Sequence, residues 1–135
     1  MLKSYDKVFD NTAWIKQATI YKETTVTTKA KIFYFHGGGL LYGSRKDLPE
    51  KHISVITQAG YEIISFDYPL APAADLEQIV PDICDSINAA CNESSLPYFL
   101  WGRSAGAYLC LIAAASGTLT RNPLGILSYY GYGLF

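Results

Sequence analysis

The sequence has few of the residues that build metal centres, disulfide scaffolds or membrane spans. It contains three cysteines, two histidines and one methionine among 135 residues. Cys84, Cys91 and Cys110 are an odd number without metal-ligand spacing, so we expect buried free thiols, no metal and no cofactor. No apolar run approaches the ~20 residues that span a bilayer. We therefore expect no membrane partner.

An excess of charge of one sign is also lacking. Eleven Lys and Arg face twelve Asp and Glu, and no block of like charge forms a patch. Because nucleic-acid binding depends on clustered positive charge, no nucleic-acid partner is expected. The first seven residues, MLKSYDK, lack the apolar region of a signal peptide, which predicts a cytoplasmic location.

What the sequence does have is the composition of a globular segment. Hydrophobic residues make up 50% of it, which is enough for a real core at this length. No internal repeat, low-complexity tract or Gly/Ser-rich linker divides the chain. We therefore expect residues 1–135 to form one unit.

Strand and helix patterns alternate along the first half. Residues 14–31 alternate apolar and polar side chains, which predicts two antiparallel strands at a sheet edge. Residues 31–36 are a nearly continuous apolar run, typical of a central strand covered on both faces. Asp47 and Glu50 predict an N-cap and capping box for a helix that Gly60 ends.

The second half continues the alternation. Residues 61–66 predict a buried strand, and residues 75–91 an amphipathic helix that becomes regular near Pro81, because proline is unfavourable inside a helix. Three more elements are expected: a strand at 97–101, a helix at 105–116 closed by Gly117, and a buried strand at 124–130. The alternation implies parallel strands joined by right-handed crossovers. The predicted fold class is α/β, a three-layer α/β/α sandwich truncated after about the sixth strand.

Ser104 is the candidate nucleophile. Residues 102–106, GRSAG, fit G-x-S-x-G and lie between an apolar strand and a helix. Gly102 and Gly106 leave room for a strained turn that projects the serine hydroxyl. The helix that begins at Ala105 directs its N–H groups and positive dipole end at the same point. The alternative is a glycine-rich turn with an incidental serine, which a second motif disfavours.

That second motif is His36-Gly37-Gly38-Gly39, directly after the central strand. Acyl transfer places negative charge on the former carbonyl oxygen, and each fixed N–H donor there contributes ~10² to 10³ in rate. We assign the oxyanion donors to the amides of Gly38, Gly39 and Ala105, with Gly37 as the alternative to either of the first two. His36 is expected to anchor the loop by hydrogen bonds, because a triad histidine follows the nucleophile in this architecture.

Three blocks of sequence resemble the hormone-sensitive-lipase-like branch of the α/β-hydrolase superfamily, the alpha/beta hydrolase-3 type of carboxylesterase. HGGGLLYGS at 36–44 resembles HGGG-x-x-x-GS, DYPLAP at 67–72 resembles DYRLAPE, and GRSAGA at 102–107 resembles GDSAGG. Their order and separation agree with the family, and the match runs from about residue 31 to residue 130.

The resemblance implies a serine hydrolase, esterase- or lipase-like, that cleaves small-molecule carboxylic esters through an acyl-enzyme intermediate. Relatives place the triad acid and histidine later in the chain, beyond Phe135. Residues 1–135 are thus expected to be the N-terminal part of a single α/β-hydrolase domain, inactive alone. Two alternatives remain open: a non-catalytic binding module derived from the fold, and peptidase-type acyl transfer on the same scaffold.

The chain also departs from the family pattern. Arg103 replaces the usual Asp, and we expect it to pair with a carboxylate rather than to select an anionic substrate. Pro69, Ala73 and Ala107 are further replacements. His52 is expected to be a surface residue.

Four residues near the motifs are candidates for lining the pocket: Leu40, Leu41, Tyr42 and Tyr132. The aromatic segment that ends the sequence suggests an exposed sheet edge. Such an edge favours self-association.

Overall fold

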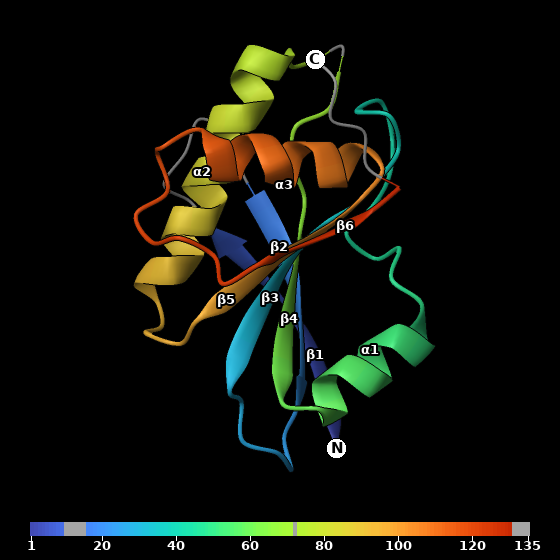
Figure 1. Ribbon diagram of the computed structural model, residues 1–135. Helices are drawn as coiled ribbons and strands as arrows, with labels where there is room; N and C mark the ends of the chain where they lie inside the picture. Colours follow the sequence, from blue (N-terminus) through green and yellow to red (C-terminus); the bar gives the residue numbers. More distant parts are fainter. Residues whose placement is uncertain (10–15, 72, 131–135) are drawn as a thin grey trace.

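The computed structural model describes residues 1–135 except 10–15, 72 and 131–135. In chain order its elements are β1 (Leu2–Phe9), β2 (Lys16–Glu23), β3 (Ala30–Phe35), α1 (Glu50–Gln58), β4 (Tyr61–Phe66), α2 (Leu76–Asn92), β5 (Tyr98–Arg103), α3 (Ala105–Ala115) and β6 (Ile126–Tyr129). The strands form one sheet in the order β1-β2-β4-β3-β5-β6. Figure 1 shows α2 and α3 on one side of the sheet and α1 on the other. The predicted three-layer α/β/α sandwich is confirmed.

The central strands are parallel, as the alternation predicted. β3 lies between β4 and β5, and β5 pairs with β6, all in parallel. The carboxyl ends of parallel strands meet at one edge of a sheet, where open α/β sheets place their sites. The block at 36–44 and the described part of the block at 67–72 follow β3 and β4, and the block at 102–107 runs from the end of β5 into α3. The topology therefore brings all three blocks to the same edge.

The antiparallel hairpin lies earlier in the chain than predicted. β1 pairs with β2, whereas residues 24–29 form the turn and connection after β2. The prediction of both strands within 14–31 was wrong because β1 is an edge strand with little burial. Leu2, Tyr5 and Val8 are 40% to 52% exposed, so the alternation of a half-buried strand is lacking.

Helix α1 begins later than its predicted cap. Pro49 occupies the N-cap position and no side chain caps the helix, so the prediction of Asp47 as N-cap was wrong. Asp47 instead accepts a hydrogen bond from the Tyr34 hydroxyl at 2.8 Å. Burial, followed by this bond, raises the pKa of Tyr34 above its usual range. Gly60 follows the helix with φ +96°, as expected for its end.

Helix α2 starts five residues before Pro81, so the expectation that it becomes regular near Pro81 was wrong. Asp75 caps it: its carboxylate accepts from the Gln78 amide at 2.9 Å, and the Gln78 side chain accepts from the Asp75 amide at 3.0 Å. A proline inside a helix costs about 3 kcal/mol. Each fully buried isoleucine contributes about 1.5–3 kcal/mol, and α2 buries Ile79, Ile83 and Ile87 completely. Their burial outweighs the cost of the proline.

Strand β6 lies at the edge of the sheet and is not the buried strand predicted. Leu127 and Tyr129 are 42% and 43% exposed, and among the described residues β6 pairs with β5 alone. A hollow of about 390 Å³ on the α1 side is lined by Ile32, Val55, Ile56, Ala59, Tyr61, Phe99, Leu127 and Tyr129. Self-association through this edge stays a prediction.

Candidate active site

Ser104 occupies a sharp turn between β5 and α3. Its backbone angles are φ 50° and ψ −115°, a conformation that non-glycine residues rarely adopt. Two backbone bonds hold the turn: the Ser104 amide donates to the Tyr129 carbonyl at 2.6 Å, and the Tyr108 amide donates to the Ser104 carbonyl at 3.1 Å. This is the strand-to-helix turn that the GRSAG motif predicted, with Ser104 at its apex.

Two glycines make the turn sterically feasible. A Cβ atom at Gly102 would lie 2.3 Å from the backbone of Gly106 and Ala107. A Cβ atom at Gly106 would lie 2.0 Å from the carbonyl oxygen of Phe35, at the end of β3. Real Cβ contacts are never so short, so both positions require glycine. Their small size lets the first turn of α3 pack against the end of β3.

The glycine loop, residues 36–44, lies beside Ser104. A Cβ atom at Gly37 would be 3.5 Å from the Cβ atom of Ser104. Gly38 and Gly39 have φ angles of +125° and +63°, in the region that favours glycine. Within the described ranges, no hydrogen bond occupies the amides of Gly38, Gly39 or Ala105. These N–H groups are therefore free to bind an acceptor.

His36 is buried at the start of the glycine loop, with 2% of its surface exposed. Its Nδ1 donates to the Gly37 carbonyl at 2.8 Å, and its ring stacks on Tyr68 with centroids 4.4 Å apart. The Tyr68 hydroxyl in turn donates to the His36 carbonyl at 2.7 Å. Gly43 closes over this ring, since a Cβ atom there would lie 2.4 Å from Nδ1.

The sequence interpretation missed the contribution of Tyr68. Its position in the DYPLAP block was the available signal, because that block follows β4 and so reaches the same sheet edge as the glycine loop. Burial of the ring could not be read from the sequence pattern, since the segment reads as a turn.

The candidate pocket-lining residues have different surroundings. Leu40 is partly buried against the core beneath α2 and α3, with φ 68°. Leu41 and Tyr42 are 60% and 71% exposed, so their side chains point away from that core. Tyr132 lies outside the described residues. Their role in lining a pocket stays a prediction.

Arg103 does not pair with a carboxylate among the described residues, contrary to the prediction. Its Nη2 donates to His52 Nδ1 at 3.1 Å, and its guanidinium lies over the Trp101 ring at 5.8 Å. Because residues 101 and 103 point to the same face of β5, Arg103 lies on the α1 side of the sheet. His52 is on the surface, as predicted, and supplies the acceptor.

The three cysteines are buried free thiols, as predicted. Burial raises the pKa of Cys110 and is the largest cause of the raised pKa of Cys91. In the part of the chain that the structure describes, no three His, Cys, Asp or Glu side chains are grouped to hold a metal. No helix in that part has both the length and the apolar character to cross a bilayer.

We expect these thiols to react slowly in the folded chain, because attack requires an exposed thiolate. Titration of the native chain with a thiol-reactive disulfide reagent should proceed at least about a hundredfold slower than in guanidinium chloride, where burial is lost. Fast reaction of one equivalent in the native chain would contradict the buried placement.

Residues 32–132 match the family described as alpha/beta hydrolase fold, and the chain belongs to that family.

Individual proteins and a solved structure are also similar to this chain. An acetyl esterase from Salmonella paratyphi B is 31% identical over 120 residues, covering 80% of this chain and 37% of the esterase. A crystal structure of an alpha/beta hydrolase superfamily protein from Enterococcus faecalis is 32% identical with a TM-score of 0.88, covering 98% of this chain and 48% of that one. A non-reducing polyketide synthase from Penicillium rubens is 30% identical over 112 residues, 71% of this chain and 4% of the synthase. The chain thus spans less than half the length of each of these relatives.

Proposed function

We propose that this chain is the N-terminal half of a serine hydrolase that cleaves carboxylic esters through an acyl-enzyme intermediate. The observation that carries the proposal is Ser104, strained at the apex of a strand-to-helix turn beside the glycine loop. Strain of this kind persists where the surrounding structure enforces it, typically at functional sites. The acetyl esterase relative supports a small ester as substrate.

In the proposed reaction Ser104 Oγ attacks the ester carbonyl carbon while a general base takes its proton. The carbon–oxygen bond of the ester then breaks, the departing alcohol takes the proton, and water cleaves the acyl-serine by the same route. The negative charge on the carbonyl oxygen is stabilised by the amides of Gly38, Gly39 and Ala105. The positive end of the α3 dipole acts on the same oxygen.

Within the described residues no side chain is bonded to the Ser104 hydroxyl, so the base comes from elsewhere in the hydrolase. Neither ring nitrogen of His36 is bonded to Ser104 in the described structure, and the ring is buried with 2% of its surface exposed. We therefore propose that His36 anchors the loop rather than transferring protons. A triad acid and histidine from the C-terminal half would complete the machinery.

The test is hydrolysis of p-nitrophenyl acetate and butyrate by the full-length hydrolase. Saturable turnover supports the proposal. Binding of small carboxylates without turnover would instead assign the fold to a non-catalytic module.

Gly38→Val is expected to lower kcat of the full-length hydrolase by at least ~10², the loss produced when one oxyanion donor is removed. A Cβ atom at Gly38 would lie 1.7 Å from the Tyr42 carbonyl oxygen, so the loop must move and carry its amides with it. Gly117→Ala is the matched control. Gly117 also has positive φ, +77°, but has open space around it, at the far end of α3. Equal kcat for Gly38→Val and the control would place the oxyanion hole elsewhere.

A further inference from the structure

The segment that follows β4 contacts the glycine loop at two points. The Tyr68 hydroxyl donates to the His36 carbonyl at 2.7 Å, where the loop begins. The Ala71 amide donates to the Leu40 carbonyl at 2.7 Å, in the middle of the loop. Neither of these two contacts reaches the far end of the loop, at Ser44. Arg45 directly follows Ser44 in the sequence.

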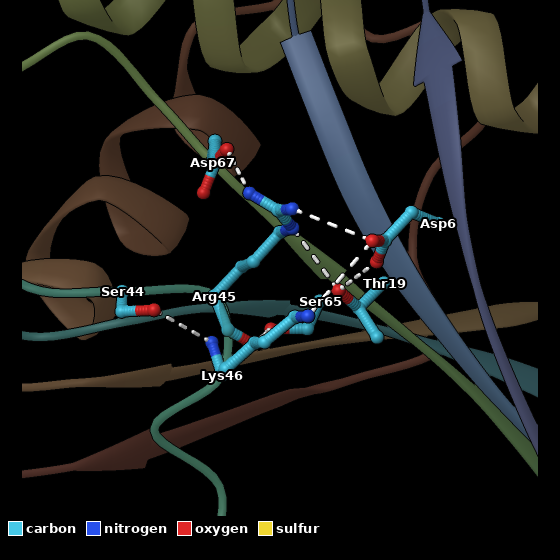
Figure 2. A network of polar contacts seen from close by, with 7 residues as sticks. All are labelled: Asp6, Thr19, Ser44, Arg45, Lys46, Ser65 and Asp67. Carbon is cyan, nitrogen blue, oxygen red and sulfur yellow. Dashed lines mark hydrogen bonds and ion pairs between the residues drawn. The ribbon is translucent and has the colours of Figure 1, made fainter.

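Arg45 connects that far end to the same segment. Its Nη1 donates to Asp67 Oδ2 at 2.6 Å and its Nε donates to Thr19 Oγ1 at 3.0 Å. The Arg45 carbonyl accepts from Ser65 Oγ at 2.5 Å. Figure 2 shows the guanidinium between Asp67, after β4, and the hairpin strands β1 and β2. Both the side chain and the backbone of Arg45 are therefore fixed to the sheet.

Two carboxylates lie near the Arg45 guanidinium, that of Asp67 and that of Asp6. Asp6 Oδ2 lies 3.7 Å from Arg45 Nη2 and 3.8 Å from Lys46 Nζ. The Thr19 hydroxyl donates to Asp6 Oδ1 at 2.8 Å and, ahead of Lys46 and Arg45, lowers the pKa of Asp6. The Arg45 side chain is only 17% exposed. The Asp67 side chain is 37% exposed, so solvent screens this charged hydrogen bond in part, but the bond is stronger than a pair exposed on both sides.

We propose that Arg45 is a positioning residue for the oxyanion hole: by bonding Asp67 and Thr19 it fixes the far end of the glycine loop and thereby the direction of the Gly38 and Gly39 amides. The inference rests on the proposed function. Oxyanion donors act only at hydrogen-bond distance from the developing charge, and a displacement of about 1 Å costs up to ~10² in rate. With Arg45 bonded, the loop is held at its beginning, middle and end.

The first test is amide hydrogen exchange by NMR on the full-length hydrolase, which needs no catalysis. Arg45→Met should speed exchange of the Tyr42 and Ala71 amides, which bond within and to the loop, at least about tenfold. The Leu100 amide in β5 should keep its rate. Lys46→Met is the matched control, since Lys46 is 59% exposed and contacts Asp6 but not Asp67.

Asp67→Asn keeps the side-chain size and removes the charge, so it should reproduce the Arg45→Met result with less risk of unfolding. In the double variant, exchange of the Tyr42 and Ala71 amides should be no more than about twofold faster than in either single variant, because the two substitutions remove the same interaction. Tyr42 and Ala71 exchange rates within about twofold of the parent in both single variants would overturn the proposal.

The second test is steady-state ester hydrolysis by the full-length hydrolase. Arg45→Met should lower kcat about 10- to 100-fold and change KM by less than about threefold, because the loop acts on the transition state rather than on substrate binding. Lys46→Met should keep the parental kcat. An inactive parent refutes the proposed function, and the exchange data alone then decide whether Arg45 positions the loop. An active parent with unchanged kcat in Arg45→Met refutes only the role of Arg45.

Discussion

Replacing Ser104 with alanine is expected to lower kcat of the full-length hydrolase for short-chain p-nitrophenyl esters by on the order of 10⁶. The change removes one oxygen atom from the apex of the turn and leaves the backbone bonds to Tyr129 and Tyr108 available. Loss of activity would therefore reflect loss of the nucleophile. A residual rate of roughly 10³ to 10⁴ over water is expected from the oxyanion donors and substrate binding.

Ser4→Ala is the matched control, because Ser4 is an exposed serine on the edge strand β1. It should keep the parental kcat, and far-ultraviolet circular dichroism should be unchanged for both variants. Activity of Ser104→Ala within tenfold of the parent would eliminate Ser104 as the nucleophile.

The second large effect is expected for a polypeptide of these 135 residues alone. It should hydrolyse esters on the order of 10⁶-fold more slowly than the full-length hydrolase, as when a triad histidine is removed. The hydroxyl of Ser104 has no bonded base within the described residues, and the buried ring of His36 is bonded to the Gly37 carbonyl and not to Ser104. Exposure of β6 should further loosen the turn, since the Ser104 amide bonds to its last residue, Tyr129.

The comparison requires the 135-residue polypeptide and the full-length hydrolase, assayed at equal concentration near neutral pH. Turnover by the short polypeptide within about a hundredfold of the full-length rate would require a base among these residues. His36 and His52 would then be tested by substitution.

Local sequence rules predicted the central part of the fold well. The buried strands and the turn at Ser104 depend on neighbouring residues: apolar runs for β3 and β4, and glycines on both sides of the serine. The close approaches at Gly102 and Gly106 are the physical counterpart of that spacing. Residues close in sequence determine such features, so a motif captures them.

The failures involve residues that are distant in sequence or only partly buried. The sequence around Asp47 is typical of a helix N-cap, but the Asp47 carboxylate instead accepts a hydrogen bond from the Tyr34 hydroxyl. The prediction that Arg103 pairs with a carboxylate was wrong, because the acceptor is His52, which lies 51 residues earlier in the sequence. Contacts between elements that are distant in the sequence leave no periodic signal in it.

The pairing of Arg45 with Asp67 belongs to the same category. The two residues are 22 positions apart and meet because the glycine loop and the segment after β4 leave the same sheet edge. Parallel pairing of β3 with β4 was predictable, but which side chains would meet there was not.

Covalent labelling measures whether Ser104 is the activated nucleophile that we propose for the full-length hydrolase. The full-length hydrolase is incubated with a fluorophosphonate near neutral pH, digested, and mapped by mass spectrometry. One adduct per chain is predicted, on the peptide that contains Ser104, and none in Ser104→Ala. An unlabelled protein, or an adduct at another serine that persists in Ser104→Ala, would show that Ser104 is not the activated nucleophile.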